Sequence, residues 1–207
     1  MNANLIPNFL RQLKRVESTA TVRNPYDSKD AVRNLRAYLN AICENSSGHL
    51  LIGEAPGYKG CALTGIPFTS PRVLRSGAHP FLDALRPSLS VTDDVAEATA
   101  TMMWNALDRN GTVPAMWNAF PFHPHQPGNA DSNRVPSWDE IRSCKRFIER
   151  IFDIAMPQTI VAVGNTSART LEKLFPELEF ESVRHPSFGG KADFIKGMNR
   201  LRIGSRS

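Results

Sequence analysis

Short runs of apolar residues recur along the chain, and each is followed by small or turn-forming residues. They cover residues 49–53, 113–118, 159–164 and 180–184. Near-continuous apolar runs of this length are typical of strands that are buried on both faces of a sheet. We therefore expect four strands in the core of the fold.

The segments between these runs have the spacing of amphipathic helices. Apolar residues recur three or four positions apart over 28–43. The segment 137–155 opens with Ser137 and has Glu140 three residues later, which is a capping-box pattern. A third helix is expected over 166–175. Strands that alternate with helices predict an α/β fold, here one three-layer α/β/α domain with a four-stranded, mainly parallel sheet.

The length and composition indicate one globular domain. The chain has 207 residues, of which 41% are hydrophobic and 22% charged, and chains usually divide into domains only beyond about 250–300 residues. This excludes disorder as the main state. We take 1–207 as one domain, with 1–27 as an N-terminal extension and 200–207 as a short basic tail.

The net charge and the cysteines indicate the kind of partner and the cellular compartment to expect. The net charge of +5 and the pI near 9.4 favour a polyanionic partner. The cysteines, Cys43, Cys61 and Cys144, are odd in number and widely spaced, so they form no disulfide framework and no paired metal signature. No apolar run is long enough for a membrane span. We expect a cytoplasmic protein with no leader and no membrane association.

Two long segments, 54–72 and 121–136, resist regular structure, and both begin where an expected strand ends. In open α/β sheets that edge is where ligands bind, and long loops in compact domains are usually functional. The first segment opens with Gly53-Glu54-Ala55-Pro56-Gly57, a sharp turn with backbone N–H groups free to bind an anion or a carbonyl oxygen.

Three further positions carry candidate chemistry. Phe68 ends a second tight loop, Asn118 ends the second strand, and His185 follows the fourth. Each has an ordinary structural reading: a core ring, a turn cap and a solvated loop histidine. An amide at a strand end also offers a donor and an acceptor to the edge of a flat heterocycle.

Taken together, the fragments GEAPG, TGIPF, a strand ending in Asn, and HPS resemble the uracil-DNA glycosylase superfamily. The resemblance covers about 50–187, and it implies the same α/β fold. It implies a monofunctional glycosylase of base excision repair, which flips uracil out of DNA and hydrolyses its N-glycosidic bond to leave an abasic site. The implied partner is uracil-containing DNA, and the protein is expected to act as a monomer.

The resemblance also implies roles for single residues. Phe68 would stack on the flipped uracil, Asn118 would pair with its O4 and N3 edge, and His185 would stabilise negative charge near O2. The turn residues Ala55 and Gly57 would line the base pocket. Tyr58, directly after the turn, could line the pocket opening, where Gly57 leaves space. The DNA-binding set would comprise Ser187 on a phosphate, and Phe188 and Lys191 in a loop pressed into the duplex. Apart from the resemblance, Arg72 begins an expected helix whose positive face could approach phosphates, although a solvated face is its ordinary role.

Departures from the family pattern matter as well. Ala55 stands where several members have a water-positioning Asp, and Gly57 stands where they have a Tyr. We therefore expect Glu54, the acid of the turn, to orient water or balance the sugar cation. Glu54-Ala55 resembles the branch that carries an iron–sulfur cluster, but three cysteines cannot supply four thiolates, so we expect no cofactor.

Other interpretations stay open. His123 and His125 have no partner with metal-ligand spacing, so a DNA-backbone or structural role is favoured and no metal is expected. Cys61 has little support as a nucleophile. The substrate could be another deaminated base, such as hypoxanthine or xanthine. Ala55 also leaves open a non-catalytic binder of DNA or abasic sites.

Overall fold

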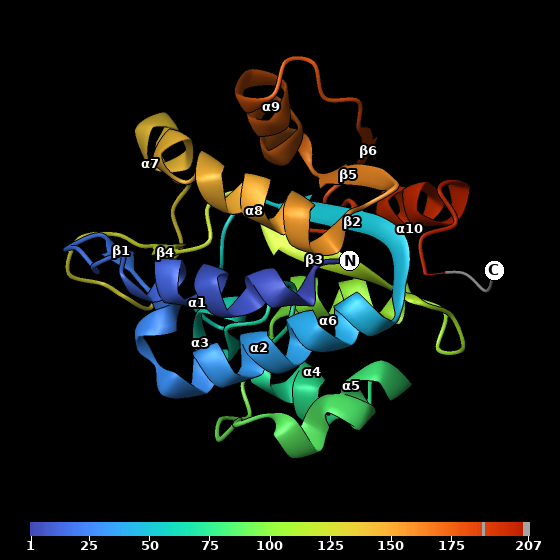
Figure 1. The fold of residues 1–207 in the computed structure, drawn as a ribbon, viewed down its shortest axis with the longest axis horizontal. Coiled ribbons are helices and arrows are strands. Elements are labelled where there is room, and N and C mark those ends of the chain that lie inside the picture. Colours follow the sequence, from blue (N-terminus) through green and yellow to red (C-terminus); the bar gives the residue numbers. More distant parts are fainter. Residues whose placement is uncertain (188, 205–207) are drawn as a thin grey trace.

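The computed structural model describes residues 1–187 and 189–204. Its central sheet consists of four strands: β2 (Ser46–Gly53), β3 (Val113–Asn118), β5 (Thr159–Val163) and β6 (Glu181–Val183). They lie in the order β3-β2-β5-β6, and all neighbouring pairs are parallel (Figure 1). The predicted α/β fold with a four-stranded parallel sheet is confirmed.

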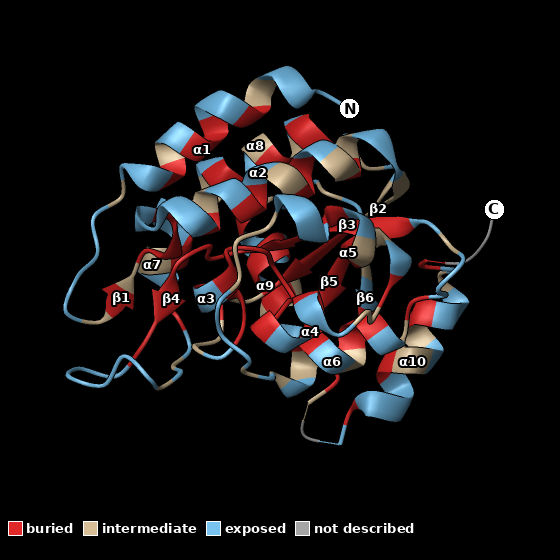
Figure 2. Cartoon of the chain, turned by 90° about the horizontal axis from the view of Figure 1, so that it is seen from below, coloured by how far each residue is buried: buried red, intermediate tan, exposed pale blue. Residues whose placement is uncertain are grey.

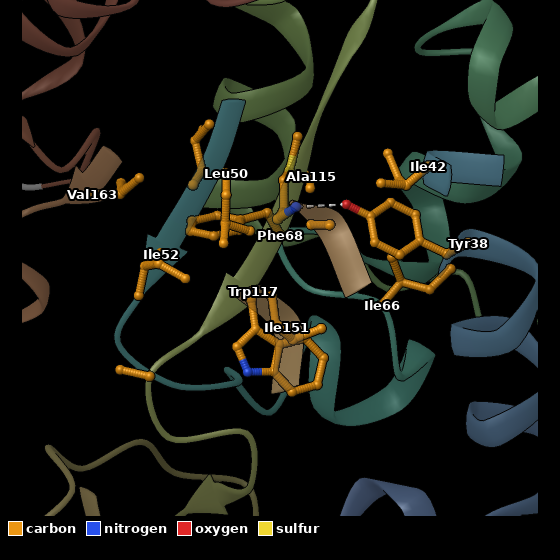
Figure 3. Close-up of a cluster of buried hydrophobic side chains, with 14 of the residues drawn as sticks. Tyr38, Ile42, Leu50, Ile52, Ile66, Phe68, Ala115, Trp117, Ile151 and Val163 are labelled. Atoms are coloured by element: carbon orange, nitrogen blue, oxygen red, sulfur yellow. Dashed lines mark hydrogen bonds between the residues drawn. The ribbon is translucent and has the colours of Figure 1, made fainter. Parts of the chain in front are cut away.

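Strand β3 lies at one edge of this sheet. Pro114, which has no N–H to donate, is tolerated there because an edge strand pairs on one side only. On β3 the N–H of Met116 donates instead to the Tyr38 hydroxyl, at 2.8 Å. Figure 3 shows Tyr38 reaching the strand among buried side chains that include Ile42 and Ile66. Helix α2 (Lys29–Glu44), which carries Tyr38, is thereby fixed to the sheet.

The helices expected over 28–43 and 166–175 are present as α2 and α9 (Asn165–Leu174). The Ser28 side chain caps α2 by accepting from the N–H groups of Asp30 and Ala31. The capping box at Ser137 and Glu140 is also present.

The prediction of one helix over 137–155 is wrong, because the segment divides into α7 (Trp138–Ser143) and α8 (Lys145–Ala155). At the junction the Cys144 N–H bonds to the carbonyl of Ile141, three residues back, and the Ser143 hydroxyl donates to the carbonyl of Glu140. Such side-chain bonds compete with the helical ladder. The break lets α8 turn its apolar face, with Phe147 and Ile151, into the core.

The remaining elements are mostly short. They are η1 (Ala3–Leu5), α1 (Ile6–Lys14), β1 (Val22–Arg23), η2 (Pro25–Asp27), α3 (Cys61–Thr64), α4 (Pro71–Arg75), α5 (Pro80–Leu85), η3 (Arg86–Ser88), α6 (Ala98–Asn105), β4 (His123–Pro124) and α10 (Lys191–Arg200). The segments 54–72 and 121–136 are thus less irregular than expected. The first contains α3 and the start of α4, and the second contributes β4, which pairs with β1 in a small antiparallel sheet.

Helices cover both faces of the main sheet. Figure 2 shows α1, α2 and α8 on one side of it and α6 and α10 on the other. The first 27 residues, expected as an extension, contribute α1 to the core: Phe9 is fully buried, with its ring centroid 5.2 Å from that of Trp117 on β3. In the described part of the chain, no helix is long and apolar enough to cross a membrane.

Candidate active site

A cavity of about 410 Å³ opens at the carboxyl ends of β2 and β3. Most of the residues singled out for a base pocket meet in its wall. The lining residues are Glu54, Ala55, Pro56, Gly57, Cys61, Phe68, Glu97, Thr99, Asn118, Asn133, Arg134, Val135 and His185. Residues from five separate segments of the sequence (54–68, 97–99, 118, 133–135 and 185) are therefore brought to one site, as expected for this edge of a parallel sheet.

The turn that follows β2 is held by backbone hydrogen bonds to the segment after β3. The N–H of Ala119 donates to the Gly53 carbonyl at 2.8 Å, and the N–H of Phe120 donates to the Glu54 carbonyl at 3.0 Å. A ring nitrogen of His123, Nδ1, lies 2.8 Å from the Pro56 carbonyl oxygen, and Nε2 lies 3.1 Å from that of Ala130. Fully buried His123 thus fixes the turn to the proline-rich loop.

Asn118 and Phe68 meet above Gly53, the last residue of β2. A Cβ on Gly53 would lie 2.5 Å from Phe68 Cζ and 2.7 Å from Asn118 Oδ1, so the close approach requires glycine. Asn118 is buried, and its Nδ2 lies 3.9 Å from the Cys61 sulfur, a weak hydrogen-bond contact that favours this orientation of the amide. The Oδ1 atom has no hydrogen-bond partner within the described residues. An acceptor and a donor therefore lie side by side at the strand end.

Phe68 has a left-handed backbone, with φ of +54°. This conformation is uncommon for a bulky residue and costs about 1–3 kcal/mol. It is maintained by Trp104 on α6, whose indole N–H donates to the buried Phe68 carbonyl at 3.0 Å. The strain therefore falls on a residue whose ring lines the cavity.

His185 is held in one tautomer. The Ser187 N–H lies 3.2 Å from His185 Nδ1, and since a backbone N–H can only donate, Nδ1 is the acceptor. The Ser187 hydroxyl lies 2.7 Å from the same nitrogen. Burial and the neighbouring Arg184 charge lower the pKa of His185. The ring is therefore neutral at pH 7, and its proton sits on Nε2.

Glu54 is a half-buried carboxyl group in the cavity wall. Burial raises its pKa, and a hydrogen-bonding contact with the Thr166 side chain, in the first turn of α9, opposes that rise. Thr166 was not expected in the site. Cys61 lines the cavity as a buried thiol whose pKa is raised well above its usual value by burial, so it is not a thiolate.

Other expected site residues lie outside the cavity wall. Tyr58 is half-buried beside it, and its N–H donates to Asn133 Oδ1 at 3.1 Å. Ser187 supports His185. Lys191 is exposed at the start of α10. Arg72 is exposed and paired with Asp94 at 3.3 Å. Phe188 lies outside the described residues.

Five lining residues were missed by every motif: Glu97, Thr99, Asn133, Arg134 and Val135. Two of them are charged. Glu97 precedes α6 in a polar stretch with no hydrophobic periodicity, so nothing in the sequence places it near the turn. Arg134 lies in the proline-rich loop and makes a bidentate ion pair with Glu140, at 2.6 and 2.8 Å, and it also donates to the carbonyls of His125 and Thr21. The sequence pointed to Glu140 as the acid of the capping box, but it did not indicate that Arg134 would be its ion-pair partner.

A family model described as "Uracil DNA glycosylase superfamily" matches residues 40–198. No curated protein sequence matches the chain. Among solved structures, the fold is similar to "The crystal structure of WT Pedobacter heparinus SMUG2", with a TM-score of 0.70, 16% identity, and coverage of 96% of this chain and 97% of that one.

Proposed function

The chain belongs to the uracil DNA glycosylase superfamily, and we propose that it is a monofunctional glycosylase that removes uracil from DNA. In this reaction the bond between C1′ of the sugar and N1 of uracil breaks, and its electrons leave with the base. Water then adds to C1′ and leaves an abasic site. The observation that carries the proposal is the meeting of Asn118, Phe68 and His185 in one cavity.

Base recognition is assigned to Asn118 and Phe68. Uracil presents an acceptor, O4, beside a donor, N3–H, and the Asn118 amide offers the complementary donor and acceptor. Cytosine presents the reverse pattern, and to pair with it the amide would have to turn and give up the contact of Nδ2 with Cys61. The Phe68 ring, fixed over Gly53, supplies a stacking surface for the base.

Stabilisation of the leaving base is assigned to His185. Because Nδ1 accepts from Ser187, the neutral ring can donate only through Nε2–H. A neutral donor aimed at uracil O2 gains strength as negative charge develops there, and such donors contribute roughly 10²–10³-fold in rate.

The nucleophilic water is assigned to Glu54. Ala55 has no polar side chain, and Glu54 is the acid of the turn after β2. Its carboxylate form is needed to orient water and to balance positive charge on the sugar. The contact with Thr166 favours that form and counteracts the effect of burial.

DNA contacts follow from the position of the cavity. Ser187 and Phe188 lie two and three residues after His185, and the exposed Lys191 begins the next helix. We propose that this loop meets the duplex from which the base is flipped. Arg72 lies outside the cavity wall, and a phosphate would have to replace Asp94 as its partner. A monomer in the cytoplasm is the proposed working form.

The test is release of free base from oligonucleotides that carry uracil, hypoxanthine or xanthine, in single and double strands. The proposal predicts release of uracil in preference to the two purines. Release of hypoxanthine or xanthine alone would favour another deaminated base as the substrate. Tight, salt-sensitive binding without release of any base would favour a binding protein.

The role of Glu54 is tested separately with Glu54→Gln. A large loss of rate with unchanged DNA affinity supports it as the residue that orients water. An unchanged rate would rule out that assignment. The exposed Glu44 ends α2 just before the amino end of β2, at the opposite end of that strand from Glu54, and offers a matched Glu→Gln control.

A further inference from the structure

Glu97 places a carboxyl group inside the cavity that no sequence motif predicted. It is the N-cap residue of α6, yet its side chain makes no capping hydrogen bond. Its oxygens instead lie against the turn after β2. A Cβ built on Gly57 would overlap Oε1, and one built on Gly60 would overlap Oε2. The carboxyl group therefore covers both glycines.

The covered glycines continue into the base-binding wall. Cys61 directly follows Gly60, lines the cavity, and contacts Nδ2 of Asn118. Glu97, Gly60, Cys61 and Asn118 thus form one continuous wall. A base that pairs with Asn118 lies against this wall, so the side chain of Glu97 limits the space beside it.

The charge state of Glu97 fits a pocket for a departing anion. No cation or hydrogen-bond donor of residues 1–187 and 189–204 pairs with its carboxyl group, and burial raises its pKa to about 7. The other titratable groups of the cavity are Glu54, Cys61, His185 and Arg134. Arg134 is occupied by Glu140, and Cys61 is a neutral thiol. Glu97 is thus half ionised near pH 7 and largely neutral at lower pH, and a neutral acid does not oppose charge on the base.

We infer that Glu97 determines which bases the pocket accepts, because its carboxyl group closes the wall over Gly57 and Gly60. This inference rests on the proposed function and specifies its substrate range: a single-ring base without a bulky substituent. Removal of the side chain would leave open space over two glycines. Bases larger than uracil, such as thymine and hypoxanthine, would then fit beside Asn118.

The experiment compares the rates of release of uracil, thymine and hypoxanthine by the wild type, Glu97→Ala and Glu97→Gln. For Glu97→Ala the rates for the larger bases relative to uracil should rise roughly tenfold or more, the scale of a methyl-sized difference in a pocket. Glu97→Gln has nearly the same shape and should keep the wild-type selectivity. The exposed Asp93, on the segment before α6, provides the control Asp93→Ala.

The dependence of the rate of uracil release on pH is a second measurement, and a purely structural role of Glu97 would not change it. Above about pH 7 the wild-type Glu97 ionises, and the rate of uracil release should fall. Glu97→Gln cannot ionise and should lose that fall. Equal selectivity of Glu97→Ala and the wild type would overturn the inference. If Glu97→Ala does not fold, Glu97→Ser replaces it in the same comparison.

Failure of the proposed function can be recognised independently. If the wild type releases no base from any of these oligonucleotides, the proposed function is wrong. The affinities of the wild type and Glu97→Ala for free uracil, thymine and hypoxanthine are then measured by NMR titration of the protein, which requires no turnover. A shift of Glu97→Ala towards the larger bases supports the inference, and an unchanged order of affinities contradicts it.

Discussion

Substitution of Gly53 by alanine tests whether the close approach of Phe68 and Asn118 matters for catalysis. The added Cβ would lie 2.5 Å from Phe68 Cζ and 2.7 Å from Asn118 Oδ1. Since non-bonded heavy atoms are most stable at about 3.5–4.0 Å, both groups must retreat by about 1 Å. Overpacking of this kind reduces the free energy of unfolding by about 1–3 kcal/mol. A misplacement of about 1 Å also costs on the order of 10²-fold in rate.

Two measurements separate these effects for Gly53→Ala. Urea unfolding gives the loss of stability, and single-turnover release of uracil gives the loss of rate in protein that remains folded. Gly128→Ala is the control: its φ of +72° makes a side chain cost about 1–2 kcal/mol, but no atom lies within 4 Å of its Cβ. A Gly53→Ala rate no lower than that of the control would refute the reasoning.

Three further predictions concern the groups that support the site. Trp104→Phe leaves the buried Phe68 carbonyl unpaired. Urea unfolding should therefore show a free energy of unfolding lower by about 1–3 kcal/mol, and uracil release should slow. The control Trp138→Phe, at an exposed position, should change neither quantity. Ser187→Ala removes the hydroxyl bond to His185 Nδ1 but keeps the backbone bond, so kcat should fall less than in His185→Ala. Because the pKa of His185 is lowered from the ordinary histidine value of about 6.5, the fall of the wild-type rate towards acid pH should have its midpoint below pH 6.5, where protonation of Nδ1 breaks its bond with the Ser187 N–H; a midpoint above pH 6.5 contradicts this.

The parts of the fold that the sequence predicted are those with strong periodicity. The four apolar runs became the four strands, and Ser28 and Ser137 mark the starts of α2 and α7. The break at Cys144 was not predictable, because apolar spacing continues through it. It depends on local bonds of Ser143 and on the packing of α8 against the sheet.

The residues of the site also fall into those that the sequence predicted and those that it did not. Glu54, Asn118 and His185 follow strands, so parallel topology alone brings them to one edge. Glu97 comes from an aperiodic segment, and its place in the cavity depends on tertiary packing against Gly57 and Gly60. The tautomer of His185 likewise depends on a bond that only the folded loop shows.

The central claim is that Asn118 reads uracil at the end of β3. The measurement that tests it most directly is the single-turnover rate of uracil release from a uracil-containing oligonucleotide, for the wild type and for Asn118→Ala. We expect release by the wild type and a loss of roughly 10³-fold for Asn118→Ala, the scale of losing a preorganised polar partner, with the free energy of unfolding little changed. Equal rates for the two proteins, or no release of uracil by the wild type from either single or double strands, would contradict it.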